Sequence, residues 1–197
     1  MTLAIIDSGG ANIASVRFAL QRLGVESVFT DDPGVIRRAD RVILPGVGAA
    51  AAAMTHLHEQ GLVECIRQLT QPVLGICLGM QLLFESSEEG DVDCLGLIPG
   101  RLKRFSQSPG LRVPHMGWNA ATTLRMDPLL VDLPQPPWFY FVHSYYVPVS
   151  DATIATTQHG VTFSAMVQRD NFRGAQFHPE RSAIAGAQVL QNFMELA

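Results

Sequence analysis

The sequence has few cysteines and no long apolar run, and both shortages exclude classes of protein. Its 197 residues include only Cys65, Cys77 and Cys94, which are too few and too irregularly spaced for a disulfide framework or a zinc site. No apolar stretch approaches the ~20 residues that a membrane-spanning helix needs. The N-terminus has no basic residue before its short apolar run, as a signal peptide would. We therefore expect a cytoplasmic protein with no membrane association.

Charge is also scarce, at 16% of residues against 47% hydrophobic, and the net charge is −4. The fourteen Lys and Arg residues are scattered, with no basic run beyond Arg37-Arg38. Because binding to nucleic-acid phosphates requires a clustered basic face, we expect no nucleic-acid partner. The length suits one domain with a sizeable core, spanning residues 1–197.

The first half of the chain alternates β-rich runs with helical patterns. The expected strands are residues 3–7, 25–29, 40–46 and 72–76. The expected helices run from a cap at Asn12 to about residue 23, over about 49–69, and over 77–84. This alternation indicates a mostly parallel sheet with helices on both faces.

From about residue 91, Gly, Pro and Ser become frequent, and β-type runs follow one another across turns. A last helix is expected over residues 183–196, with Ser182 as its cap. The whole pattern predicts one α/β domain, with a central parallel or mixed sheet flanked by helices and additional antiparallel strands in the second half.

The stretch "PVLGICLGMQLLF", residues 72–84, places Cys77 between Gly75 and Gly79. This Gly-x-nucleophile-x-Gly pattern, where a strand meets a helix, is typical of a nucleophile elbow. The helix N-terminus favours the thiolate, and the amide of Leu78 points to where an oxyanion would form. A buried, unreactive thiol fits the same five residues, so the motif alone leaves both interpretations open.

A cysteine nucleophile needs a base, usually histidine. In "QFHPERS", Pro179 favours an extended His178, so His178 and Glu180 project to the same side. Nucleophile, base and orienting acid are then all present. The alternative is a loop in which both are ordinary polar residues, and the Cys77 elbow makes it the weaker one.

His56, His58 and His159 are weaker candidates for a functional role. His56 and His58 lie two apart in an expected helix and therefore face different ways, so no metal pair is expected. His159 precedes Gly160 in an expected hairpin turn, where we expect it to be solvated. Cys65 and Cys94 lack the pair of glycines, one on each side, that flanks Cys77, and are interpreted as structural.

Five motifs in order together resemble one family over nearly the whole chain. They are "LPGVGA" (44–49), "GICLGMQ" (75–81), "PHMGWN" (114–119), "YFVHSYY" (140–146) and "GAQFHPERS" (174–182). The elbow and "FHPE" resemble the class I, triad-type glutamine amidotransferases. "PHMGWN" and "FVHSY" narrow the resemblance to the glutaminase subunits of imidazole glycerol phosphate synthase.

The resemblance implies that Cys77 attacks the side-chain amide of glutamine, that His178 transfers protons and that Glu180 orients His178. It implies an oxyanion hole made by backbone amides of Leu78, Gly46 and Val47. It implies a glutamine pocket lined by Gly48, Gln81, His143, Ser144 and Tyr145. It implies no metal and no organic cofactor.

The resemblance also implies a heterodimer with a (β/α)8-barrel cyclase subunit, which uses the ammonia to make imidazole glycerol phosphate and aminoimidazole carboxamide ribotide in histidine biosynthesis. The implied interface residues are Asn12, Met116, Trp118 and Arg181. Trp118 and Met116 fit a core position equally, and Asn12 fits a helix cap. We expect the oxyanion hole to be completed only by a partner-driven movement of "PGVG", since a glycine loop changes conformation cheaply.

Two departures from the family pattern lie outside the triad. This chain has "HPERSA" where the family often has "HPEKSG", and it has Ser8 where the family usually has an aromatic residue.

Two other functions remain open. A glutaminase for pyridoxal phosphate synthesis lacks support, because its "GGES" signature is absent and "PHMGWN" is left unexplained. A catalytically silent regulatory subunit usually lacks the cysteine or histidine, and both are present here.

Overall fold

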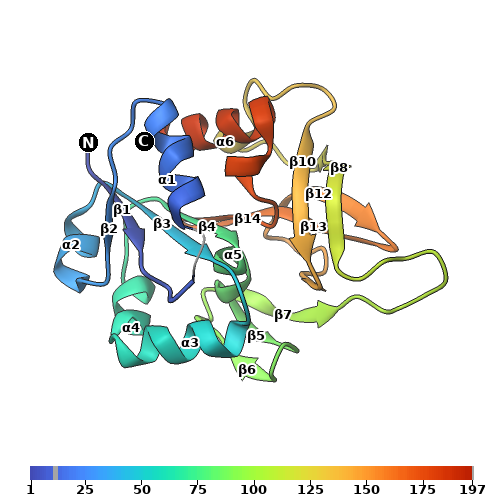
Figure 1. The fold of residues 1–197 in the computed structure, drawn as a ribbon, viewed down its shortest axis with the longest axis horizontal. Helices are drawn as coiled ribbons and strands as arrows, with labels where there is room; N and C mark the ends of the chain where they lie inside the picture. Colours follow the sequence, from blue (N-terminus) through green and yellow to red (C-terminus); the bar gives the residue numbers. More distant parts are fainter. Residues whose placement is uncertain (11–12, 197) are drawn as a thin grey trace.

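The computed structural model describes residues 1–10 and 13–196, and its centre is an eight-stranded sheet (Figure 1). The strand order is β2-β1-β3-β4-β14-β13-β12-β9. The first five strands of this order pair in parallel: β2 (Val28–Thr30), β1 (Leu3–Ile6), β3 (Arg41–Gly46), β4 (Val73–Cys77) and β14 (Phe172–Ala175). The last three pair antiparallel: β13 (Val161–Arg169), β12 (Thr153–His159) and β9 (Thr122–Thr123). The predicted α/β domain with a mixed sheet is confirmed.

Helices cover both faces of the parallel half, as Figure 1 shows. Alternate side chains of β1 point to opposite faces, as in any strand. Leu3 and Ile5 pack with α1 (Ile13–Arg22) and α6 (Ala183–Glu195). Ala4 and Ile6 pack instead on the face formed by four helices. These are α2 (Pro33–Arg38), α3 (Ala50–Glu59), α4 (Leu62–Arg67) and α5 (Leu78–Leu82).

Two smaller β units lie beside the sheet. One is a four-stranded sheet in the order β11-β7-β5-β6, made of β11 (Tyr145–Tyr146), β7 (Ile98–Arg104), β5 (Phe84–Ser87) and β6 (Val92–Asp93). The other is an antiparallel ribbon of β8 (His115–Ala120) and β10 (Trp138–His143). Two short 3-10 turns, η1 (Pro128–Leu130) and η2 (Pro179–Arg181), complete the described elements.

Some predicted boundaries were wrong. The helix expected over residues 49–69 is two helices, because Gly61 takes a left-handed conformation (φ 65°) between α3 and α4. The helix expected over 77–84 ends at Leu82, and Phe84 already begins β5. The second strand begins at Val28 rather than at residue 25.

Helix α2 was missed, although its sequence carries a start signal. Asp32 accepts hydrogen bonds from the amides of Gly34 and Val35, and Pro33 occupies the first turn. The Asn12 cap lies outside the described residues. Ser182 stands at the start of α6 but makes no capping hydrogen bond, because its hydroxyl is used elsewhere, as described below.

Candidate active site

Cys77 ends β4 and takes a strained backbone conformation, with φ 53° and ψ −110°. Its glycine neighbours are sterically required. A Cβ added to Gly75 would lie 2.7 Å from the carbonyl oxygen of Gly79, and one added to Gly79 would lie 1.8 Å from that of Leu44. The strand-to-helix turn is therefore the predicted elbow. A packed structural thiol gives no reason for such strain, which costs of order 1–3 kcal/mol and is typical of active sites.

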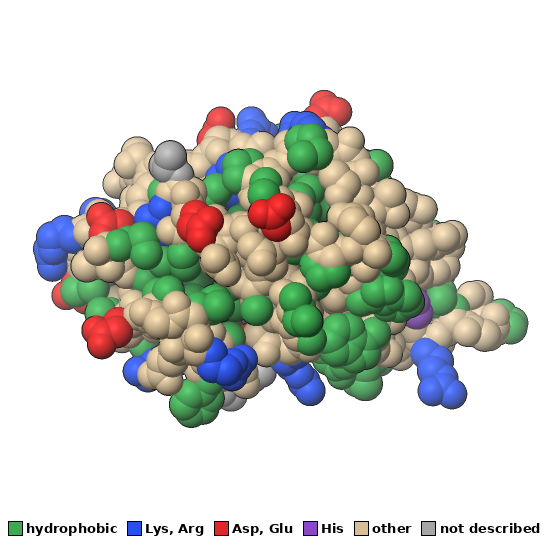
Figure 2. Space-filling view, turned by 90° about the horizontal axis from the view of Figure 1, so that it is seen from above, with side chains coloured by type: hydrophobic (Ala, Val, Ile, Leu, Met, Phe, Trp, Pro, Cys, Tyr) green, Lys and Arg blue, Asp and Glu red, His purple; other side chains and the backbone are tan. Residues whose placement is uncertain are grey.

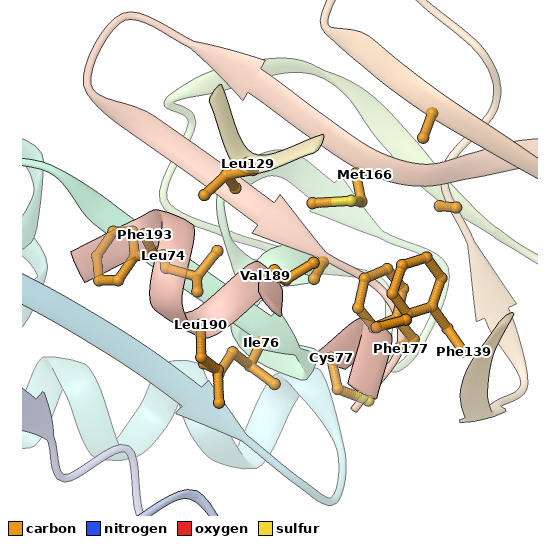
Figure 3. Packing of buried hydrophobic residues seen from close by; sticks show 14 of the residues in the cluster. Leu74, Ile76, Cys77, Leu129, Phe139, Met166, Phe177, Val189, Leu190 and Phe193 are labelled. Atoms are coloured by element: carbon orange, nitrogen blue, oxygen red, sulfur yellow. The ribbon is translucent and has the colours of Figure 1, made fainter. Parts of the chain in front are cut away.

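Cys77 is 7% exposed and lies where a hydrophobic core meets a cavity. Figure 3 shows Leu74, Ile76 and Cys77 along β4, with Leu190 of α6 packed nearby and Cys77 beside Phe177. The stacked rings of Phe139 and Phe177, 3.7 Å between centroids, form part of the same core. The sulfur is thus fixed by packing on one side and open to the cavity on the other.

His178 and Glu180 form a buried pair, with 2.9 Å between Nδ1 and Oε1. The two side chains meet as expected, but not along one extended segment, because His178 is extended whereas Glu180 lies in the 3-10 turn η2. Among the described residues, His178 Nε2 has no hydrogen-bond partner, so it is free to act on a substrate. Burial lowers the pKa of His178, but Cys77 and Glu180 outweigh burial and raise it to about 10. An imidazolium at this position favours the nucleophilic thiolate form of a neighbouring sulfur.

Strand β10 holds the segment that carries this pair. The amide of His178 donates to the carbonyl of Tyr140 (2.9 Å), and the amide of Tyr140 donates to Ser182 Oγ (2.9 Å). The Ser182 hydroxyl donates to the carbonyl of His178 (2.7 Å), which is why it does not cap α6. The guanidinium of Arg181 lies 4.7 Å from the centre of the Tyr140 ring. The base is therefore positioned by a rigid strand rather than by a free loop.

Cys77 and His178 line a cavity of about 380 Å³. Most of the residues expected around glutamine line it, namely Val47, Gly48, Leu78, Gln81, His143, Ser144 and Tyr145. Gly46 does not line it, but is in register with Cys77 across the β3–β4 pair and borders a smaller space beside His178 and Glu180. A larger cavity, about 510 Å³ beside Arg125 and Gln168, contains none of the triad residues.

Gln81 is nearly buried, and its hydrogen bonds define what it offers a substrate. Its Nε2 donates to the carbonyl of Tyr145 (3.0 Å) and to Gln176 Oε1 (2.9 Å). Both amide hydrogens are thus used inside the protein. Gln81 therefore presents its carbonyl oxygen, an acceptor, to the cavity.

His143 lines the cavity, but both ring nitrogens are used within the protein. Nδ1 lies 2.7 Å from the carbonyl of Tyr145, and Nε2 lies 3.1 Å from Nδ1 of His115. His159 was expected to be solvated, and it is only partly so, because the residue is half-buried. Its ring stacks on His115 with 4.2 Å between centroids, and its Nε2 donates to the carbonyl of Arg112 (2.7 Å).

Glu89 also lines the cavity, and the sequence analysis missed it. Its Oε2 accepts a hydrogen bond from the amide of Ala50 (2.8 Å) at the start of α3. No spacing links it to Cys77 in the sequence, because it reaches the cavity through the turn that follows β5. Its carboxylate gives the cavity a negative group.

Met116 and Trp118 are 63% and 51% exposed, so neither is a core residue. They lie on the outer face of the β8–β10 ribbon, where Trp118 contacts Tyr140 edge to face. In the view from above (Figure 2), hydrophobic side chains gather on the right, the side of the ribbon in Figure 1, with few charges among them. Asn12, the fourth expected interface residue, lies outside the described residues.

Residues 4–196 match the family model described as glutamine amidotransferase class-I. The chain belongs to this family.

Within the part of the chain that the structure describes, no group of three or more His, Cys, Asp or Glu is arranged to hold a metal ion. None of the described helices has the length and apolar character needed to cross a membrane.

Curated relatives are similar over almost their full lengths. The imidazole glycerol phosphate synthase subunit HisH of Xylella fastidiosa (strain Temecula1) is 57% identical, and the match covers 98% of this chain and 97% of the relative. That of Xanthomonas campestris pv. campestris (strain 8004) is 55% identical, with 99% and 98% covered. A solved glutamine amidotransferase from Thermotoga maritima is similar in fold, with a TM-score of 0.67, 17% identity, and 99% and 81% covered.

Replacing Glu180 by Gln tests the base. Glu180→Gln keeps the shape of the pair but removes the charge that favours the His178 imidazolium. We expect glutamine hydrolysis to fall by ~10²–10⁴-fold in kcat. Steady-state kinetics with the partner subunit measures this, and Glu59→Gln, on the exposed face of α3, is the matched control. Equal rates for the two variants would remove Glu180 from the triad.

The buried histidines make folding sensitive to acid. Burial is the main cause that lowers the pKa of His115 to about 4 and that of His143 to about 3, from 6.5. Below pH 6.5 the unfolded chain therefore binds more protons than the folded chain. The free energy of unfolding should fall by up to about 1.4 kcal/mol per pH unit for each histidine. His178, whose folded pKa is raised to about 10, has the opposite effect near its unfolded pKa of 6.5, because there it is fully protonated only in the folded chain. This opposing slope fades as the pH falls toward about 5, where His178 is protonated in both states.

Urea unfolding at several pH values between about 6 and 5, where His178 contributes least, measures this slope. His115→Asn removes one of the two titrating rings, so it should reduce the slope by about half. An unchanged slope in His115→Asn would show that His115 is not the group responsible.

Proposed function

We propose that the chain, as one domain over residues 1–197, is the glutaminase subunit of an imidazole glycerol phosphate synthase. The observation that carries the proposal is the strained Cys77 elbow, which opens into the same cavity as His178, the ring that Glu180 holds. The two curated relatives described above are subunits of that synthase. Glutamine is hydrolysed to glutamate and ammonia, and the ammonia passes to the cyclase subunit.

The cavity suits an α-amino acid with a side-chain amide. Glu89 is placed to receive the α-ammonium group, since among the described residues that line the cavity it is the acidic one. Gln81 offers an acceptor, and the segment Ser144–Tyr145 borders the same end. Glutamine bound in this way directs its side-chain amide toward Cys77.

The reaction then follows from the geometry. The Cys77 thiolate attacks the amide carbon, and the oxyanion that forms accepts hydrogen bonds from the amides of Leu78 and of the Gly46-Val47 segment. The imidazolium of His178 gives its Nε2 proton to the amide nitrogen as the C–N bond breaks. Ammonia leaves, and the glutamyl group remains on the Cys77 sulfur as a thioester. Neutral His178 next takes a proton from water, and the hydroxide equivalent attacks the thioester. Glutamate leaves and the thiolate–imidazolium pair is restored, with no metal or organic cofactor required.

The partner is the (β/α)8-barrel cyclase subunit, which forms imidazole glycerol phosphate and aminoimidazole carboxamide ribotide in the cytoplasm. Met116, Trp118 and Arg181 form the proposed contact with it, together with Asn12. Exposed aromatic and Arg side chains are typical anchors of such interfaces. Arg181 also lines the glutamine cavity and stacks on Tyr140, which links the contact surface to the triad segment.

The oxyanion hole is proposed to be completed when the partner moves residues 45–48. Such gating prevents futile hydrolysis of glutamine.

A glutaminase serving a different synthase is not favoured, because both curated relatives described above are HisH subunits. A silent regulatory subunit would have no use for the strained Cys77 or for its paired base.

A glutaminase assay tests this function. The isolated chain, its complex with the cyclase, and the complex with the cyclase's nucleotide ligand should release glutamate at increasing rates. Equal rates in all three would contradict the partner-gated oxyanion hole. No glutamate release in any of them would contradict the proposed function.

A further inference from the structure

A buried chain of hydrogen bonds connects strand β8 to the sulfur of Cys77, and the chemistry above does not use two of its members. These are His115, 5% exposed, and Gln176, which is fully buried. The two residues lie 61 positions apart in the sequence. Gln176 connects to the carbonyl oxygen of Tyr145 through Gln81, and His115 connects to it through His143. This oxygen accepts from Gln81 Nε2 at 3.0 Å and from His143 Nδ1 at 2.7 Å.

The first arm of the chain runs from the Tyr145 carbonyl through Gln81 and Gln176 to the sulfur of Cys77. Its donors and acceptors follow from the carbonyl, which can only accept a hydrogen bond. Gln81 therefore turns its NH₂ group toward Tyr145, and the same NH₂ group lies 2.9 Å from the side-chain amide of Gln176. The atom of Gln176 that faces it must be the acceptor Oε1. The Nε2 of Gln176 then points to the sulfur of Cys77, at 3.9 Å.

The second arm runs from the Tyr145 carbonyl through His143 and His115 to Asn119, and its donors and acceptors are determined in the same way. His143 must carry its hydrogen on Nδ1 to donate to Tyr145, so in its neutral form Nε2 is an acceptor. His115 Nδ1 donates to that Nε2 at 3.1 Å, which leaves His115 Nε2 to accept from Asn119 Nδ2 at 3.3 Å. The remaining hydrogen of the Asn119 amide goes to the carbonyl of Gln158 at 2.9 Å. Both rings stay neutral because burial lowers the pKa of each.

The start of the second arm lies directly behind the proposed partner surface. His115 and Asn119 point inward from β8, whereas the intervening Met116 and Trp118 are exposed. His115 is also held by its ring contacts, stacked on Phe141 at 4.9 Å and on His159 at 4.2 Å. One strand therefore carries the partner surface on one side and the polar chain on the other.

We propose that His115 and Gln176 are positioning residues of the glutaminase site, which act through the Tyr145 carbonyl to fix Gln81 and the Cys77 sulfur. The inference rests on the proposed function. Without His115, the buried Nε2 of His143 loses its donor, and the ring no longer holds Tyr145 in place. Without Gln176, the Gln81 amide is free to turn and the sulfur loses an N–H donor that favours its charged form.

The first test uses the complex with the cyclase and compares glutamine-dependent with ammonia-dependent synthesis. His115→Phe keeps the stacked ring but has no donor, whereas His115→Asn places its Nδ2 near the original Nδ1. We expect His115→Phe to lower kcat/KM for glutamine about tenfold to a hundredfold, mainly through KM. His115→Asn should restore it to within about threefold of the wild type, and ammonia-dependent synthesis should be unchanged in both.

A Met side chain is nearly the same size as Gln but has no amide group, so Gln176→Met removes both hydrogen bonds of the Gln176 amide. It should lower kcat for glutamine about tenfold or more, while Gln191→Met, at an exposed site on α6, should have no effect. The second test needs no partner: alkylation of Cys77 by iodoacetamide at pH 7, measured peptide by peptide. Gln176→Met should slow this alkylation several-fold, and Gln191→Met should not change it.

Each outcome decides the matter. Wild-type kcat/KM in both His115→Phe and Gln176→Met would overturn the proposal. So would a His115→Asn variant as impaired as His115→Phe, because an N–H donor at this position would then not be what the site requires. If the wild-type complex does not hydrolyse glutamine, the proposed function fails. The alkylation rates then still decide whether Gln176 acts on the sulfur.

Discussion

Cys77→Ala should abolish glutamine-dependent synthesis by the complex, by at least about 10⁴-fold, and leave ammonia-dependent synthesis intact. The variant removes the only atom that forms the thioester, while the cyclase still receives ammonia from solution. Parallel assays of the same complex with glutamine and with an ammonium salt measure the two rates. A variant complex that uses glutamine at a normal rate would show that Cys77 is not the nucleophile.

The other cysteines are the natural controls for this experiment. Cys65 and Cys94 are buried and lie outside the glutamine cavity. Burial raises the pKa of both thiols, that of Cys94 to about 11, so they are poor nucleophiles at neutral pH. Cys65→Ala and Cys94→Ala should keep glutamine-dependent synthesis, with a loss of stability from the small cavity each creates.

Gly79→Ala should have the second large effect, this time on folding. The added Cβ would lie 1.8 Å from the carbonyl oxygen of Leu44, so β3 and the elbow must separate. We expect a loss of ~3 kcal/mol or more in the free energy of unfolding, and with it the loss of glutaminase activity. Urea unfolding monitored by circular dichroism measures the first quantity.

Gly24→Ala is the matched control for this substitution. Gly24 has φ +74° and no atom within 4 Å of its added Cβ, so the variant has only the backbone cost of about 1–2 kcal/mol. A Gly79→Ala variant no less stable than Gly24→Ala would show that strand and helix can separate without cost. The steric account of the elbow would then be wrong.

The features that could be predicted from the sequence are those with local causes. The elbow requires two glycines within five residues, and His178 and Glu180 stand on either side of Pro179, so both were recognisable from short stretches. The backbone between the pair was not, since Glu180 lies in a 3-10 turn rather than in an extended segment. The alternation of strands and helices likewise predicted the mixed sheet. Gly61 shows the limit, since a single left-handed residue divided a helical pattern that looked continuous.

Other features depend on contacts between distant residues. His115 meets His143 across a strand pair, and Gln81 meets Gln176 although 95 positions separate them. No spacing in the sequence indicates such pairs. His159 is only partly solvated for the same reason, because the fold brings an aromatic cluster against a residue that stands beside a turn. Glu89 reaches the cavity only through the path of β5.

Covalent trapping tests the central claim, that Cys77 attacks glutamine with His178 as its base. The complex is incubated with an electrophilic glutamine analogue, and the modified peptide is identified by mass spectrometry. The account predicts one adduct, on Cys77, which excess glutamine prevents and which His178→Asn slows. An adduct on Cys65 or Cys94 alone, or no adduct in a complex that hydrolyses glutamine, would contradict it.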